Sequence, residues 1–232
     1  MELIELFGFL SALVIGISLG LIGGGGSILA VPVLAYLFSV DEKTATAYSL
    51  FIVGCSALLG GIKQHYKGFV NWKIAFVFGI PAIIGVTIVR KFVVPALPDV
   101  IITIDSFDFT RRMAMFGLFA TLMIPAAISM LKDRKEILDQ VNKNTTYNYQ
   151  LIVLEGIVVG IITGLIGAGG GFIIIPALVL LANLDMKTAI GTSLIIIAVK
   201  SLFGFFLGDT FNLKIDWMFL STFTLISLIG IL

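Results

Sequence analysis

The hydrophobic pattern of the chain consists of apolar runs separated by short polar connections. An α-helix needs about 20 apolar residues to span a bilayer, and most of the runs approach that length. The runs at 27–38 and 171–183 are too short for a straight crossing helix. Each is either a half-helix that begins in mid-membrane or a steep short crossing, and hydropathy alone does not choose. The runs cover 6–22, 27–38, 44–62, 74–94, 112–131, 151–166, 171–183, 188–207 and 217–232.

Both short runs follow a glycine cluster, and the two clusters match. The first is Gly23 to Gly26 followed by Ser27, and the second is Gly167 to Gly171 with one alanine inside it. Each is preceded by Gly-Leu-Ile, and Pro32 and Pro176 stand at matching positions further on. A break in regular backbone inside an apolar region is costly unless the freed peptide groups face protein, water or a ligand. We therefore expect function at these two breaks.

The match between the clusters extends along both halves of the chain. At the offset of 144 positions that separates Gly23 from Gly167, Lys43-Thr44-Ala45 aligns with Lys187-Thr188-Ala189. A duplication with short, glycine-interrupted segments at matching positions is typical of secondary transporters whose site lies between the repeats. The alternative is a duplication that only builds a symmetric helical bundle. We favour the transporter, because a passive bundle has no need for paired backbone breaks at membrane depth.

The most polar stretch of the chain divides it into two halves. We predict a first membrane repeat at 1–131, a polar linker at 132–150 and a second membrane repeat at 151–232. The second repeat lacks a counterpart of the run 112–131, through truncation or divergence, and Arg90-Lys91 is expected to open a long connection after the run 74–94. Five crossings per half give inverted repeats and four give parallel ones. Lys and Arg residues are balanced between the two faces in either scheme, so the positive-inside rule does not decide, and we favour the inverted arrangement.

Composition fixes the class of protein. Of 232 residues, 59% are hydrophobic and 12% are charged, and the mean hydropathy is +1.12. Such a chain has too little polar surface for a soluble globule, so we predict an all-α polytopic membrane protein with the lipid bilayer as its surroundings. A net charge of +1 gives no nucleic-acid footprint, and a single cysteine gives no disulfide framework or cysteine-based metal site. We expect no cofactor and leave a homo-oligomer open.

The glycine breaks offer chemistry for anions. A helix that begins after a break has first-turn N–H groups without partners and the positive end of its dipole behind them. Ser27 adds a hydroxyl at the first break; the alternative is that the glycines only allow close helix packing. Lys200 lies inside an apolar run, where it either holds an anion or extends its ammonium to the interface. Ser49 and Ser193 either line a permeation path or bond to their own helices. The candidate substrate-binding residues are Gly23, Gly24, Gly25, Gly26, Ser27, Gly167, Gly169, Gly170, Gly171, Ser49, Ser193 and Lys200.

The paired motifs Gly20 to Ser27 and Gly164 to Gly171 resemble the sulfite exporter TauE/SafE family. The segments Ala189 to Leu194 and Asp216-Trp217 fit the same pattern, so the likeness covers nearly the whole chain. The resemblance implies a multi-pass inner-membrane transporter of a small sulfur-containing oxyanion, such as sulfite or a sulfonate. It leaves the particular solute and the direction of transport open, because members of the family differ in both.

Other classes of function predict different residues. A channel or carrier for a cationic solute needs acidic groups along its path, and beyond Glu155 the membrane segments offer almost none. An intramembrane enzyme needs a reactive set of side chains, and the sole histidine, His65, follows an apolar run in a basic connection. We therefore expect no enzymatic or metal site. A non-transporting membrane subunit would tolerate alanine at either glycine cluster.

Overall fold

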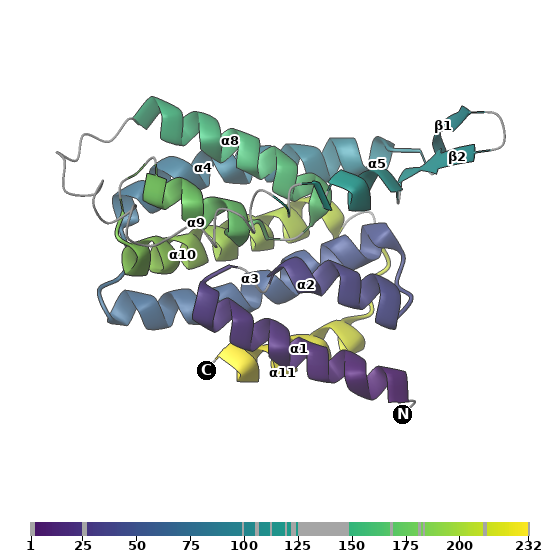
Figure 1. The fold of residues 1–232 in the computed structure, drawn as a ribbon, viewed down its shortest axis with the longest axis horizontal. Helices are drawn as coiled ribbons and strands as arrows, with labels where there is room; N and C mark the ends of the chain where they lie inside the picture. Colours follow the sequence, from purple (N-terminus) through teal and green to yellow (C-terminus); the bar gives the residue numbers. More distant parts are fainter. Residues whose placement is uncertain are drawn as a thin grey trace.

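The computed structural model is helical in nearly all of its regular elements (Figure 1). It describes residues 3–24, 27–98, 100–104, 107–111, 113–118, 120–121, 124, 149–167, 169–180, 182, 184–210 and 213–231. Its α-helices are α1 (Leu3–Ile22), α2 (Ser27–Pro32), α3 (Glu42–Tyr66), α4 (Trp72–Ile88), α5 (Val94–Ala96), α8 (Tyr149–Ile166), α9 (Gly171–Leu180), α10 (Met186–Gly204) and α11 (Trp217–Ile231). Three π-helical segments extend them: η1 (Val33–Leu37), η2 (Val89–Val93) and η3 (Phe205–Asp209).

Within the described residues, four continuous helical runs are long and apolar enough to cross a membrane. They are Glu42–Tyr66, Trp72–Ala96, Tyr149–Ile166 and Met186–Asp209. Their most apolar windows have mean hydropathies between 1.7 and 2.0. The prediction of an all-α membrane protein is therefore confirmed.

Polar residues in the connections begin the long helices. The Asp41 side chain accepts a hydrogen bond from the Lys43 N–H at the start of α3, and Asn71 caps α4 in the same way. Asp185 caps α10 through the Thr188 N–H, and the Asp216 side chain accepts from the first turn of α11. These caps satisfy N–H groups that a helix start leaves without partners. They set where each helix begins.

The long helices lie side by side in a layered arrangement (Figure 1). α4 and α8 run along one edge, α1 and α11 along the opposite edge, and α3 and α10 lie between them. Glycines at the crossings give the relative directions. Gly54 of α3 packs against Leu202 of α10, while Gly60 packs against Leu194, so α3 and α10 are antiparallel.

The outer helices follow the direction of the central helix that they touch. Gly160 and Gly164 of α8 pack against Ala82 and Val86 of α4, so those two helices are parallel, and α4 is parallel to α10. By the same reasoning α1 and α11 are parallel to α3. Helices α1, α3 and α11 therefore point one way, and α4, α8 and α10 point the other way.

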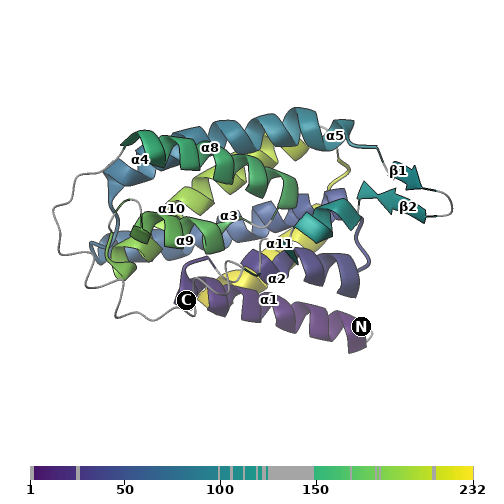
Figure 2. The ribbon, with the colours of Figure 1, turned by 45° about the horizontal axis from the view of Figure 1, so that its top comes forward.

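One expectation about the connection after α4 was wrong. The helical run does not end before Arg90; η2 and α5 carry it on to Ala96, so Arg90 lies inside a membrane-length helix. The segment beyond it contains a two-stranded antiparallel hairpin, β1 (Val100–Ile104) and β2 (Phe107–Thr110), which projects from one end of the bundle (Figure 2). In its register Ile102 lies opposite Phe109 and Ile104 opposite Phe107.

The predicted linker mostly lies outside the described residues. α8 begins at Tyr149, two positions before the expected start of the second half. The expected boundary at 131 also falls in this part of the chain, so both limits of the linker stay predictions.

Candidate functional site

Of the described glycines in the two clusters, Gly171 begins α9 and the others lie outside the helices; these are Gly23, Gly24, Gly167, Gly169 and Gly170. α1 ends at Ile22 and α2 begins at Ser27, while α8 ends at Ile166 and α9 begins at Gly171. Gly23 and Gly167 have φ angles of 77° and 73°, a left-handed conformation that glycine adopts without steric cost. Gly25, Gly26 and the side chain of Ser27 lie outside the described residues.

The two glycine segments touch each other between α3 and α10. Gly24 packs directly against the Cα atom of Gly171, and a Cβ atom on either residue would collide with the backbone of the other. Gly171 also lies beside Ile197 of α10. The structure therefore brings together Gly24 from the first cluster and Gly171 from the second, 147 positions apart in the sequence.

Lys200 lies beside the second glycine segment with its ammonium buried. The side chain is about 1% exposed, and its Nζ atom donates a 2.6 Å hydrogen bond to Thr163 Oγ1 of α8. A Cβ atom on Gly170 would lie 3.1 Å from the same Nζ atom. Lys200 stands inside the 24-residue helical run Met186–Asp209 with its side chain enclosed by protein, and both interpretations of its role stay predictions. No carboxylate of the described residues lies within ion-pair distance of it.

The two predicted serines are both buried, Ser49 on α3 and Ser193 on α10. Ser193 Oγ lies 3.1 Å from the Gly23 carbonyl and 2.8 Å from the Ile190 carbonyl, so it joins α10 to the first segment. Ser49 of α3 is fully buried, and within the described part of the chain its hydroxyl has no hydrogen-bond partner. An unpartnered buried hydroxyl is a free donor for a bound molecule.

A buried ion pair that the sequence analysis missed lies at the other end of the second segment. Arg90 Nη1 is 3.3 Å from Asp209 Oδ1 and 3.1 Å from Thr46 Oγ1, and Arg90 is fully buried. Its Nη2 atom packs against Gly167. The sequence signal was weak, because Arg90 stands at the end of an apolar run, where a basic residue ordinarily reaches the interface.

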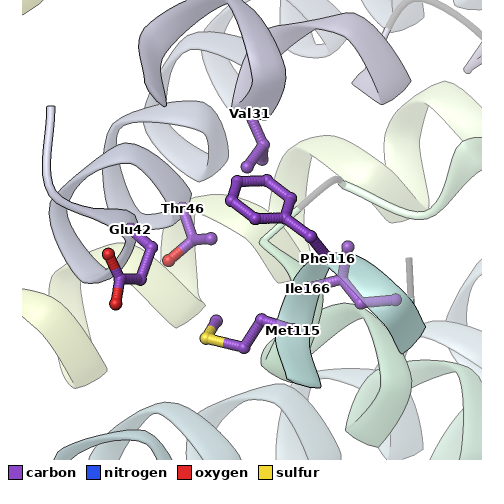
Figure 3. Close-up of a pocket in the computed structure, with 6 residues that line it drawn as sticks. All are labelled: Val31, Glu42, Thr46, Met115, Phe116 and Ile166. Atoms are coloured by element: carbon purple, nitrogen blue, oxygen red, sulfur yellow. The ribbon is translucent and has the colours of Figure 1, made fainter. Parts of the chain in front are cut away.

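A small hollow opens next to this ion pair (Figure 3). Thr46, which binds Arg90, forms part of its wall, and so does Ile166, the residue before Gly167. An ion pair between Glu42 and Arg111, 3.0 Å long, lies at its polar side. The lining residues are Val31, Glu42, Thr46, Met115, Phe116 and Ile166.

The charges around the second glycine segment are unbalanced. Arg90 lies against Gly167 at one end of the segment, and Lys200 lies beside Gly170 at the other end. Among the described residues, Arg90 forms an ion pair with Asp209, whereas Lys200 forms none. The N-terminus of α9 follows directly and adds the positive end of its dipole. Buried cations without matching carboxylates attract an anion.

Comparison with known proteins agrees with a membrane transporter. The family described as "Sulfite exporter TauE/SafE" matches residues 8–232. A "Probable membrane transporter protein" of Xylella fastidiosa (strain 9a5c) is 31% identical over 190 residues, which cover 81% of this chain and 67% of that protein. "Probable membrane transporter protein YdhB" of Bacillus subtilis (strain 168) is 27% identical over 185 residues, 79% of this chain and 70% of that protein.

The chain spans about two thirds of the length of the relatives that it matches. No solved structure matches it significantly. The family match covers nearly the whole sequence and includes both glycine clusters, Lys200, Arg90 and Asp209. This chain belongs to the sulfite exporter TauE/SafE family of membrane transporters.

Proposed function

We propose that the protein carries a small sulfur-containing oxyanion, such as sulfite or a sulfonate, across the cell membrane. The anion binds where the two glycine segments meet, and relative rocking of the two halves exposes it to each side in turn. The observation that carries this proposal is Lys200. Its ammonium lies at membrane depth beside Gly170, with a hydroxyl partner and no carboxylate within ion-pair distance in the described structure.

Matching contacts support two homologous halves. The N–H of Asn71 donates to Thr192 Oγ1 at 2.9 Å, and the N–H of Asp216 donates to Tyr48 OH at 2.7 Å. Thr192 lies 144 positions after Tyr48, and Asp216 lies 145 after Asn71, so the two bonds are equivalent under the sequence repeat. We infer that a two-fold axis in the membrane plane relates the halves.

The same equivalence applies to the tight helix crossings. Gly16 of α1 packs against Gly230 of α11, and Gly160 of α8 packs against Gly85 of α4. The long helices α1, α3 and α4 run opposite to α8, α10 and α11, respectively, which supports the proposal of inverted repeats. Inverted repeats allow the two halves to exchange conformations, and this supports alternating access around a fixed central site.

The chemistry around the site supports an anion as the solute. The first N–H groups of α9 and the ammonium of Lys200 are both donors. The family's description as sulfite exporters supports sulfur oxyanions within the wider class of anions. Pairing with Lys200 lowers the cost of taking a charged solute through the hydrocarbon region.

The test is uptake of radiolabelled sulfite and radiolabelled methanesulfonate by proteoliposomes. We expect the purified protein to move at least one of them saturably, and Lys200→Met to reduce the rate at least about tenfold, since it removes the charge and keeps most of the side-chain volume. Lys187→Met is the matched control: it lies on the same helix, with its ammonium 5.7 Å from the centre of the Phe69 ring, away from the site. If neither anion moves, or if Lys200→Met transports at the native rate, the proposal is wrong.

A further inference from the structure

Arg90 and Asp209 occupy unusual backbone segments that pack against each other. Arg90 lies in η2 and Asp209 in η3, and both segments are π-helical turns that continue a longer α-helix. π-turns inside α-helices are frequent at functional sites. Close packing holds the pair: Gly208 lies directly against the Arg90 Cβ atom, where any larger residue would collide.

The hydrogen-bonding capacity of this pair is only partly used. Arg90 Nη1 serves both Asp209 and Thr46, while Nε and Nη2 have no partner among the described residues. Asp209 Oδ2 is likewise unpartnered there. A buried arginine and carboxylate would ordinarily form two parallel hydrogen bonds, and unused buried donors carry a desolvation penalty. Two free donors on one guanidinium edge match two oxygens of an oxyanion.

Arg90 contacts both the wall of the hollow and the second glycine segment. Nη2 packs against Gly167, and Nη1 donates to Thr46, which lines the hollow (Figure 3). Lys200 lies beside Gly170, at the far end of the same glycine segment. An anion that enters from the hollow therefore meets Arg90 first and Lys200 second.

We infer that Arg90 is a second anion-binding residue of the transport path, and that Asp209 occupies part of its guanidinium when no anion is bound. This inference rests on the proposed function and concerns the same oxyanions. The incoming anion takes the Nε and Nη2 donors, the Asp209 contact loosens, and the anion then passes along Gly167 to Gly170 toward Lys200. Asp209 lowers the affinity of the outer position, which lets the anion move on.

This outer position belongs to one face of the membrane. The sequence counterpart of Asp209 in the first half is His65, which lies at the end of α3 on the opposite face. His65 Nδ1 accepts a 3.3 Å hydrogen bond from Trp72 Nε1 at an exposed position. In the described structure a buried arginine therefore lies at the Asp209 end of the path and an exposed histidine at the matching position of the other end, and we assign anion capture by arginine to the mouth beside the hollow.

The experiment measures the half-saturating sulfite concentration for uptake into proteoliposomes. The double variant Arg90→Gln/Asp209→Asn replaces the ion pair by a neutral pair of similar shape, and we expect its half-saturating concentration to rise at least about tenfold. Asp209→Asn alone removes the competing carboxylate and keeps the arginine. We expect this variant to lower the half-saturating concentration severalfold.

The control is Lys91→Gln, a loss of the same charge one residue further on, where the ammonium lies 5.7 Å from the centre of the Phe92 ring. It should leave the half-saturating concentration unchanged. A native value in the double variant, or an unchanged or higher value in Asp209→Asn, would overturn the inference and leave the pair a structural element. Lack of sulfite and methanesulfonate uptake by the unmodified protein would instead refute the proposed function itself.

Discussion

Gly167→Ala tests the close contact between the second glycine segment and Arg90. The substitution imposes two separate costs. An alanine at a φ of 73° costs about 1–2 kcal/mol, because the left-handed region brings its Cβ atom too close to the backbone. The same Cβ atom would collide with Thr46 and lie 2.5 Å from Arg90 Nη2, and overpacking of this kind costs about 1–3 kcal/mol more. The sum is about 2–5 kcal/mol.

Gly68→Ala separates the two costs. Gly68 has a φ of 77°, almost the same as Gly167, but no atom lies within 4 Å of the position that its Cβ atom would take. Gly68→Ala should therefore carry only the cost of the left-handed backbone, which lowers the free energy of unfolding by about 1–2 kcal/mol. In a domain of this size 1 kcal/mol corresponds to about 2–4 °C in melting temperature. Gly167→Ala should melt about 2–12 °C below Gly68→Ala.

The assay is thermal unfolding of both variants and the native protein in the same detergent, followed by tryptophan fluorescence. Equal melting temperatures for the two variants would refute the reasoning, since the contact with Thr46 and Arg90 would then impose no cost. A Gly167→Ala variant that melts with the native protein would further show that the left-handed backbone is not required there.

Two further predictions concern interactions away from the site. Ser56 Oγ and Ser227 Oγ form a buried 3.0 Å hydrogen bond, so Ser227→Ala should lower the free energy of unfolding by about 0.6–1.7 kcal/mol. The double variant with Ser56→Ala should lose less stability than the sum of the two single changes. A double-mutant cycle followed by thermal unfolding measures both effects. Partial burial raises the pKa of Asp185, but hydrogen bonds from Thr188 outweigh that effect and the net pKa lies below its usual value. The stability from this cap is therefore present above about pH 4 and lost as the pH falls through the lowered pKa, so Asp185→Ala should be less stable than the native protein at pH 6 and approach it toward pH 3.

The sequence predicts the helical membrane class because hydropathy and length directly reflect the demands of the bilayer. It also locates the ends of α1 and α8, since Gly23 and Gly167 directly follow them with positive φ angles. These are local properties. A single chain segment contains all the information that determines them.

The sequence does not predict the partners of charged residues, because pairing depends on packing between distant segments. Arg90 and Asp209 lie 119 positions apart, and each stands at the end of an apolar run, where interfacial positions are common. The sequence likewise does not reveal that Lys200 donates a hydrogen bond to Thr163 of α8, 37 positions away. The hairpin at Val100–Thr110 was missed because its strands are short and flanked by prolines that favour a connection.

The burial of Lys200 also has a consequence for how the chain is made. On the translocon's insertion scale a lysine near the middle of a helix costs about 2.5–3.5 kcal/mol, while each leucine, isoleucine or valine contributes about −0.3 to −0.6 kcal/mol. The aliphatic run before Lys200 therefore offsets most of that cost, and its members are Leu194, Ile195, Ile196, Ile197 and Val199. Substitutions that replace these aliphatic residues by polar ones will prevent α10 from passing from the translocon into lipid. Such variants will therefore be lost during biosynthesis, and not through weaker packing in the finished protein.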